Sequence, residues 1–176
     1  PRLAREVLSY LALLQARDDV SFEDAEPGKI VHELRRGEMV STGEVPFRRY
    51  YGSVDSTPLF IMLAGRYLET TADLPFLENL WPVIRAGLRW IDEHGDLDGD
   101  GFIEYHRRSP RGLVNQGWKD SGDSVSHADG RLAEGPIALV EVQAYVYDAK
   151  IQGSRIAKRL GLTGYSDQLL LEAEEL

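Results

Sequence analysis

Apolar residues recur at helical spacing in five segments of the chain, and two long polar stretches interrupt the series. The five segments cover residues 2–17, 57–70, 77–95, 136–160 and 166–176. Apolar residues at every third or fourth position are typical of amphipathic helices that bury one face. The sequence therefore predicts an all-α fold.

The first predicted helix carries one apolar stripe, and the second has a recognisable start. The stripe of the first helix consists of Leu3, Val7, Tyr10, Leu11 and Leu14. The second helix is expected to begin near Thr57, because threonine can cap a helix N-terminus and Pro58 suits the first helical position.

Proline and glycine mark the limits of the later helices. The apolar seam of the third is formed by Leu77, Leu80, Trp81, Ile84, Leu88 and Ile91. Pro82 predicts a kink in this helix, and Gly95 is its expected end. The fourth should place Pro136 at its first position and run on to Leu160, before Gly161. Because it has apolar residues on nearly every side, we expect it to be buried all round.

The polar stretches, residues 18–49 and 96–135, carry no sustained period and are expected to form long loops. Loops of this length are usually functional or disordered. Ile30–Leu34 and Gly101–Tyr105 are the only segments expected to pair in short hairpins. Helices joined by alternately short and very long connections suggest a helical toroid, with its functional site on the long-loop face.

Charge and composition narrow the classes of partner. The chain has 176 residues, 43% of them apolar and 28% charged, with a net charge of −9 and no cysteine. This is enough for one domain or part of one. The negative charge disfavours nucleic acid, whose binding depends on Lys and Arg neutralising phosphates. No apolar run approaches the roughly 20 residues that span a bilayer, so we expect no membrane partner and a cytoplasmic location.

The segment from residue 96 to 104 has the chemistry of a calcium loop. Its candidate ligands are the carboxylates of Asp96, Asp98 and Asp100 and the carbonyl of Phe102. Alternating carboxylates followed by glycine suit a hard cation. The twelfth position is Arg107 rather than the bidentate glutamate of an EF-hand, so Glu104 or another carboxylate would have to complete the shell. The alternative is a metal-free loop whose aspartates cap backbone amides in tight turns.

The segment from Gln116 to Ser124 combines an aromatic ring, a cation, carboxylates and hydroxyls. Trp118 offers a face on which a pyranose ring can stack, and glycoside hydrolysis needs a carboxylic acid such as Asp120. We expect Trp118 to exclude water from Asp120 and to raise its pKa. The alternative is a turn in which Ser121 or Asp123 caps a helix.

Gln116 is itself a candidate for substrate binding, and three pairs of residues outside this segment are further candidates. They are Tyr51 with Asp55, Glu141 with Gln143, and His32 with Glu33. Asp55 could equally cap the helix that follows it, and the pair on the fourth helix could form hydrogen bonds in the core. His32 and Glu33 are weak evidence on their own. The four histidines lack the spacing of a zinc site.

Five stretches, taken together and in order, resemble the amylo-alpha-1,6-glucosidase family, the bacterial relatives of the glucosidase part of glycogen-debranching enzymes. They cover residues 27–38, 49–58, 96–105, 113–123 and 134–145. The resemblance implies an (α/α)6 barrel, of which residues 1–176 would be a single incomplete domain amounting to roughly half. It also implies inverting hydrolysis of α-linked glucose in glycogen or oligosaccharides, with no required cofactor.

The resemblance assigns roles to individual residues. Asp120, in the Trp-Lys-Asp motif, would be the general acid. The terminal glucose would lie among Tyr51, Asp55, Trp118, Lys119 and Glu141. The general base would come from outside this chain, so we expect the isolated piece to be inactive and to self-associate through its exposed half-barrel seam. The rival interpretations are a trehalase-like α-glucosidase and a non-catalytic helical carbohydrate-binding module.

Overall fold

The computed structural model describes residues 1–176 and is mostly helical, which confirms the predicted all-α class. The helices are α1 (Arg2–Leu13), α2 (Glu38–Ser41), α3 (Ser56–Thr71), α4 (Leu74–Trp90), α5 (Val140–Arg159) and α6 (Thr163–Glu175). A 3₁₀ turn covers Ser21–Glu23, and a π-helical turn, Ile91–Gly95, follows α4 directly. None of the helices combines the length and apolar character needed to cross a bilayer.

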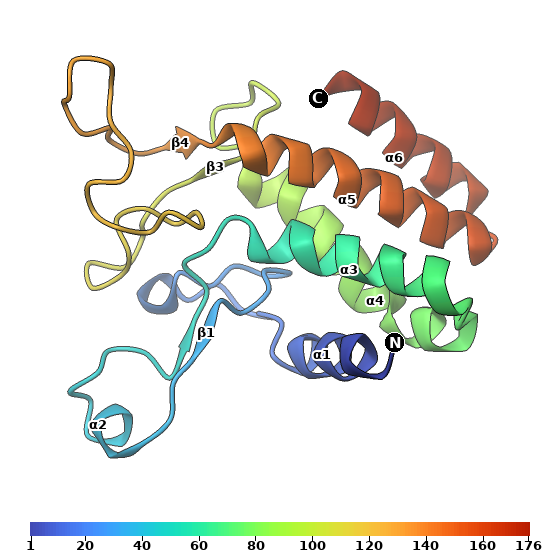
Figure 1. Ribbon diagram of the computed structural model, residues 1–176, viewed down its shortest axis with the longest axis horizontal. Helices are drawn as coiled ribbons and strands as arrows, with labels where there is room; N and C mark the ends of the chain where they lie inside the picture. Colours follow the sequence, from blue (N-terminus) through green and yellow to red (C-terminus); the bar gives the residue numbers. More distant parts are fainter.

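The long helices form one body, and the long connections gather at one end of it (Figure 1). α3 and α5 lie side by side and run in the same direction, with α4 packed against both. α6 packs on α5, and α1 packs on α3 and α4. The connections at residues 14–55 and 96–139 therefore meet at the end where α3 and α5 begin.

The core lies between these helices. The seam predicted for the third helix is confirmed, because Leu77, Ile84, Leu88 and Ile91 are at most 1% exposed. Burying one such side chain stabilises the fold by about 1.5–3 kcal/mol. Pro82 lies inside α4, which continues past it to Trp90.

A buried lysine joins three elements of the body. Lys150 of α5 is 8% exposed, and its Nζ donates to Asp92 of the π-helical turn at 2.8 Å and to Glu172 of α6 at 2.9 Å. Burial by itself would lower the pKa of Lys150, but these two carboxylates raise it overall. The pair keeps the amine charged despite its burial.

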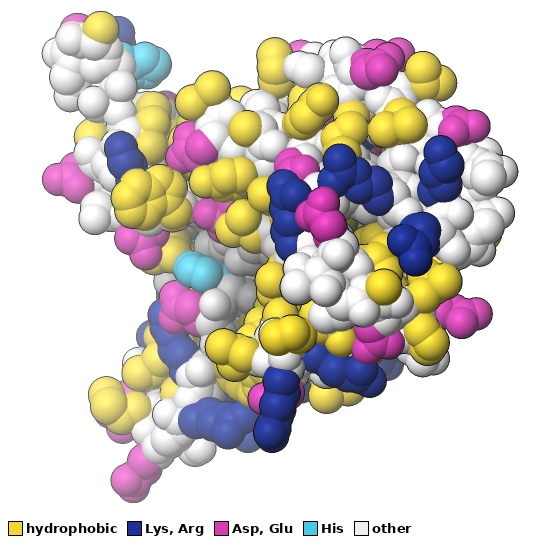
Figure 2. Space-filling view, turned by 45° about the vertical axis from the view of Figure 1, so that its right-hand side comes forward, with side chains coloured by type: hydrophobic (Ala, Val, Ile, Leu, Met, Phe, Trp, Pro, Cys, Tyr) yellow, Lys and Arg dark blue, Asp and Glu magenta, His cyan; other side chains and the backbone are white.

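The stripe predicted on the first helix is only partly correct. Leu8 is fully buried and was not in the stripe, whereas Leu3 is 74% exposed and Tyr10 is 44% exposed. The helix packs on the body through its Leu8 side, so much of the predicted stripe faces solvent. Figure 2 shows hydrophobic side chains interspersed with acidic and basic ones over one face of the molecule.

The start of the second predicted helix needs a small correction. α3 begins at Ser56, so Thr57 lies inside it and does not cap it. Thr57 is fully buried, and its Oγ1 accepts a hydrogen bond from the amide of Ile30 at 3.0 Å. The hydroxyl therefore anchors the preceding loop to the helix.

The fourth helix departs more from its prediction. Pro136 is not helical, because the next two residues form strand β4 (Ile137–Ala138) and α5 begins at Val140. The helix is not buried all round, since Val140 is 83% exposed and Tyr147 is 48% exposed. Its end agrees with the prediction, because α5 stops at Arg159, just before Leu160 and the left-handed Gly161.

Each long connection contains one small antiparallel ladder. β1 (Glu33–Leu34) pairs with β2 (Arg49–Tyr50), and β3 (Glu104–Tyr105) pairs with β4. The predicted strand segments contain β1 and β3, but both strands pair with distant partners and not in local hairpins. The ladder of β3 and β4 closes the long connection just before α5.

Candidate functional site

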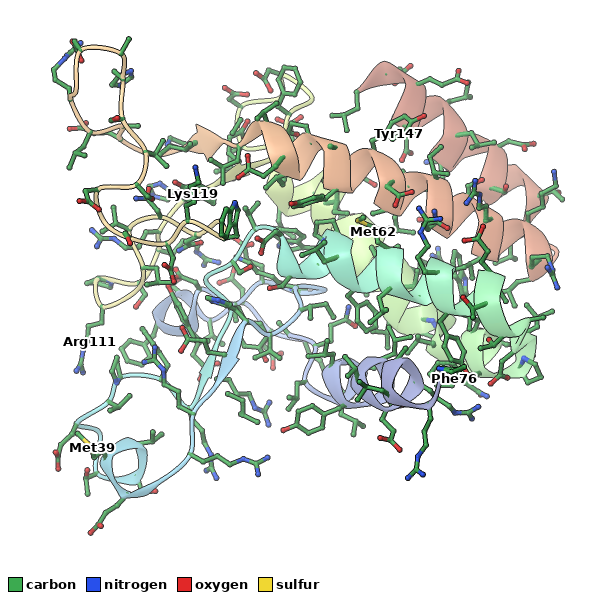
Figure 3. The ribbon with its side chains drawn as sticks, viewed as in Figure 1. Met39, Met62, Phe76, Arg111, Lys119 and Tyr147 are labelled. Carbon is green, nitrogen blue, oxygen red and sulfur yellow. The ribbon has the colours of Figure 1, made fainter.

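The residues of the predicted sugar site lie at the loop end of the molecule. The segment 113–124, called here the Trp118 loop, crosses beside the N-terminal ends of α3 and α5 (Figure 3, where Lys119 marks it). Asp55 immediately precedes α3, and Glu141 lies in the first turn of α5. The fold therefore brings these three predicted parts of the site to one end of two parallel helices.

The Trp118 loop has a buried base and an exposed tip. Asn115 and Gln116 are at most 2% exposed, whereas Trp118 is 70% exposed and Lys119 and Asp120 are also exposed. A rigid base under an exposed tip is how a scaffold presents reactive side chains to a ligand.

Hydrogen bonds hold the base of the loop on two sides. The carbonyl of Gln116 accepts from the amide of Val54 at 2.8 Å, which ties the loop to the start of α3. On the other side, Asn115 accepts from the Tyr105 hydroxyl at 2.7 Å and donates to the carbonyl of Ser121 at 2.7 Å. The tip is thus framed by bonds before and after it.

The tip itself is open to solvent. The Nζ atom of Lys119 lies 6.0 Å from the centroid of the Trp118 ring, and no hydrogen bond involves the Asp120 carboxylate. Contrary to the prediction from sequence, Trp118 does not exclude water from Asp120, because both side chains project from the loop. The predicted caps are also absent: Ser121 and Asp123 start no helix.

Asp55 occupies the N-cap position of α3 without capping it. Its carboxylate accepts a hydrogen bond from the Ser53 hydroxyl, and no helix amide donates to it. The Ser53 Oγ instead accepts from the amide of Ser56 at 3.2 Å. The capping role that was one alternative for Asp55 is thus filled by Ser53. The half-buried Asp55 carboxylate can still accept hydrogen bonds from a ligand.

Glu141 and Gln143, predicted as a pair, have different surroundings. Gln143 accepts from the amide of Ile103 at 2.8 Å and donates to the carbonyl of the same residue at 2.8 Å, so it clamps β3 to α5. Burial, and then the charge of Glu141, raises the pKa of Tyr105. The charge of Glu141 thus acts on the Tyr105 hydroxyl that holds Asn115, while Gln143 binds the backbone of Ile103.

The remaining predicted residues belong to the segment around β1 and β2. Tyr51 is 2% exposed and its hydroxyl donates to the carbonyl of Leu14 at 2.7 Å. Glu33 pairs with Arg35 at 2.7 Å, and the Nδ1 atom of His32 lies 4.0 Å from Glu33. No hydrogen bond or ion pair joins these residues to the Trp118 loop.

A buried carboxylate that the sequence did not indicate lies beneath the loop. Asp24 is 1% exposed, and its carboxylate accepts four hydrogen bonds, one of them from the Nε2 atom of Gln116 at 3.1 Å. Nothing near Asp24 in the sequence could have shown this, because an aspartate in a polar loop is ordinarily solvated.

A small cavity of about 70 Å³ lies behind these loops. Its lining includes Lys29, Glu26, Trp90 and Arg108. Lys29 is 6% exposed, and its Nζ atom lies 3.6 Å from Glu26 and 5.3 Å from the centroid of the Trp90 ring. Burial lowers the pKa of Lys29, although Glu26 and Asp24 act in the opposite direction.

A second arrangement, called here the acidic loop (residues 96–104), gathers four carboxylates. One oxygen from each of Asp96, Asp98, Asp100 and Glu104 lies within 4.8 Å of the others. Gly101, with φ of 92°, allows the chain to curl around them. The set contains the three predicted aspartates and Glu104, which the sequence offered as a completing carboxylate, and the binding of calcium stays a prediction.

The aspartates also accept backbone amides within the acidic loop. Asp96 accepts from Gly99 at 2.7 Å and from Gly101 at 3.0 Å, and Asp100 accepts from Phe102 at 2.8 Å. Both interpretations of the sequence can therefore hold together, because a carboxylate has several lone-pair sites. The carbonyl of Phe102 as a ligand stays a prediction.

Glu104 is the buried member of this cluster. It is 8% exposed, and its Oε2 atom accepts from the amide of Leu97 at 2.8 Å. Burial raises the pKa of Glu104, the Leu97 amide opposes this, and the charges of Asp98, Asp100 and Asp96 raise it further. A bound divalent cation would offset this repulsion, and carboxylate oxygens are the ligands that calcium prefers.

Comparison with known proteins adds no identification. The chain matches no model of a known protein family, and no curated protein matches it either.

Proposed function

We propose that this chain is part of the catalytic domain of an inverting glycoside hydrolase that acts on α-linked glucose, of the glycogen-debranching type. The observation that supports this best is the Trp118 loop. An exposed indole and an exposed carboxylic acid are presented together on a rigid base, at the same end as Asp55 and Glu141. This is the set of groups that binding and cleaving a sugar requires.

Each group has a part in the proposed reaction. The Trp118 ring stacks on the apolar face of a glucose unit, while Asp55, Glu141 and Lys119 bind its hydroxyls. Asp120 gives its proton to the glycosidic oxygen as the bond to the anomeric carbon breaks. A water molecule attacks that carbon from the opposite face and loses its proton to a base. In inverting enzymes this base lies about 6.5–9.5 Å from the acid, and we assign none within residues 1–176.

The helix arrangement supports the barrel that the proposal implies. α3 and α5 run parallel with α4 between them in the chain, and α6 returns antiparallel to α5 (Figure 1). One helical hairpin is the repeating unit of an (α/α)6 barrel, and α3 with α4 and α5 with α6 would be two successive units. Residues 1–176 would then form roughly half of such a barrel, with the site on its long-loop face.

Calcium in the acidic loop is part of the same proposal. Asp96, Asp98, Asp100 and Glu104 would hold it, and the ion would supply structural charge compensation and no chemical step. Because Gln143 clamps Ile103, next to Glu104, to α5, a rigid acidic loop would also steady the start of that helix.

A binding experiment on residues 1–176 tests the sugar site without requiring catalysis. We expect a linear maltooligosaccharide to bind and Trp118→Ala to abolish binding, measured by calorimetry. Trp81→Ala is unsuitable as a control because Trp81 packs against the core, so Tyr147→Ala, an exposed aromatic on α5, serves instead. An equal loss of oligosaccharide affinity in Trp118→Ala and Tyr147→Ala, or no binding by the unaltered chain, would count against the proposal. Binding of trehalose in preference to α-glucans would favour the trehalase-like alternative.

A further inference from the structure

Asp24 lies in an unusual backbone conformation at the centre of the loop end. Its φ is 52° and its ψ is 30°, in the left-handed region, although it directly follows the short 3₁₀ turn. Aspartate tolerates this region better than most residues, but strained positions persist where the surroundings over-determine them, and they cluster at functional sites.

The carboxylate of Asp24 is satisfied by neutral donors alone. Its Oδ1 atom accepts from the amides of Arg108 at 2.7 Å and Ser109 at 2.8 Å, and its Oδ2 atom accepts from the Tyr50 hydroxyl at 2.9 Å and Gln116 Nε2 at 3.1 Å. No Lys or Arg side chain forms an ion pair with it. Burying a carboxylate is costly unless donors satisfy it, so losing any one of these four donors is unfavourable.

These donors come mainly from the chain that leads into the Trp118 loop. The Tyr50 hydroxyl also accepts from the amide of Leu113 at 2.7 Å. Asp24 and Tyr50 therefore bind residues 108, 109, 113 and 116, and the last of these bonds lies two positions before Trp118. Gln116 is gripped at both ends, since its carbonyl accepts from Val54.

We propose that Asp24 is a positioning residue that sets the orientation of the Trp118–Asp120 tip through its bond to Gln116. The role of the tip in binding a sugar rests on the proposed function. The positioning of the tip by Asp24 does not depend on any substrate. A purely structural role would stabilise the fold and leave the tip's orientation unchanged when the bond is broken.

The test is fluorine NMR of residues 1–176 in which 5-fluorotryptophan replaces tryptophan. The chain has three tryptophans, so the Trp118 signal is the one that Trp118→Phe removes, and Trp81 serves as the internal reference. Asp24→Asn keeps an acceptor for the two amides but turns donors toward the Gln116 amide, which cannot accept through its nitrogen, and toward the Tyr50 hydroxyl, which can accept. We expect the Trp118 signal to move toward the position of free 5-fluorotryptophan while the Trp81 signal stays in place.

Two further variants separate positioning from stability. Adding Gln116→Glu to Asp24→Asn exchanges donor and acceptor across the same bond, and we expect it to return the Trp118 signal to its original position. Ser154→Ala removes the buried 2.9 Å bond between Ser154 and Ser166, far from the loop. It should lower the unfolding midpoint without moving the Trp118 signal.

The inference is overturned if Asp24→Asn lowers the unfolding midpoint as Ser154→Ala does and leaves the Trp118 signal unmoved. If Asp24→Asn fails to fold, Gln116→Met serves as the test by itself. This variant removes only the hydrogen bond between Gln116 and Asp24 and leaves the other three bonds of the Asp24 carboxylate. An unmoved signal in that variant overturns the inference as well. A moved signal in a chain that binds no α-glucan sustains the positioning role and counts against the proposed function only.

Discussion

The amide of Val54 donates a 2.8 Å hydrogen bond to the carbonyl of Gln116, which fixes the Trp118 loop against the residues that precede α3. These two residues are 62 positions apart in the chain, and neither carries a side chain with obvious catalytic chemistry. Their bond nevertheless brings the exposed tip to the end of the helix pair where Asp55 and Glu141 lie. The site is thus built by backbone contacts between loops.

Calcium should stabilise the chain through the acidic loop. A ligand at 100 times its Kd adds about 2.7 kcal/mol to the free energy of unfolding, which for a chain of this size raises the melting temperature by about 5–10 °C. We expect this shift on adding saturating calcium, measured by calorimetry, and its loss in Asp98→Asn. Asp129→Asn, an exposed aspartate outside the cluster, should keep the shift. An unchanged melting temperature in the unaltered chain would refute the calcium site.

Gly65 allows α3 and α5 to pack closely. A Cβ atom added there would lie 2.5 Å from the Cβ of Gln152, too close to be relieved by rotating a side chain. Gly65→Ala should therefore destabilise the fold by about 1–3 kcal/mol, as over-packing of cores generally does. Gly164→Ala in α6 meets no atom within 4 Å and should be neutral or stabilising. Urea unfolding measures the stability of both variants. Equal changes in the free energy of unfolding would contradict the close contact between Gly65 and Gln152.

Lys29 should make stability depend on pH in a defined direction. Burial lowers the pKa of Lys29 in the folded chain below its ordinary value of 10.5, so the unfolded chain binds more protons between those two values. Stability relative to Lys29→Met should therefore rise as pH increases toward 10.5. Lys158→Met, a substitution of an exposed lysine on α5, is the matched control for replacing a lysine by methionine. A flat or falling difference for Lys29 would show that its ion pair with Glu26 outweighs its burial.

Self-association stays a prediction, and α1 is where the structure would place it. Leu3 and Leu13 are 74% and 76% exposed on this helix. Exposed apolar surface of this kind favours contact between molecules. We expect light scattering to show a mass that rises with concentration, and Leu13→Glu to reduce that rise. A constant monomer mass at high concentration would contradict the expectation.

Local signals in the sequence predicted that the long helices exist and where some of them end, because these features depend on neighbouring residues. The seam from Leu77 to Ile91, the end of α5 before Gly161 and the alternating carboxylates of the acidic loop all depend on residues close in sequence. Glu104 could be named as a completing ligand for the same reason.

The features that sequence could not predict depend on distant contacts. The sequence pattern predicts helix at Ile137 and Ala138, but these residues form a strand because they pair with β3. Gln143 joins α5 to the chain before β3 only because Ile103 lies opposite it in the fold. Asp24 resembles any loop aspartate until four donors from elsewhere converge on it. The exposure of Trp118 likewise follows from how the whole loop is anchored.

The assignment of Asp120 as general acid is tested most directly by comparing two kinds of substrate with the natural chain that carries residues 1–176. Asp120→Asn should lower kcat for α-linked glucose oligosaccharides by about 10²- to 10⁴-fold, the usual contribution of general acid catalysis. It should leave hydrolysis of α-glucosyl fluoride nearly intact, because fluoride departs without a proton, and the first product should be β-glucose. Asp123→Asn should change neither rate. Equal loss on both substrates, or normal cleavage of oligosaccharides by Asp120→Asn, would contradict the assignment.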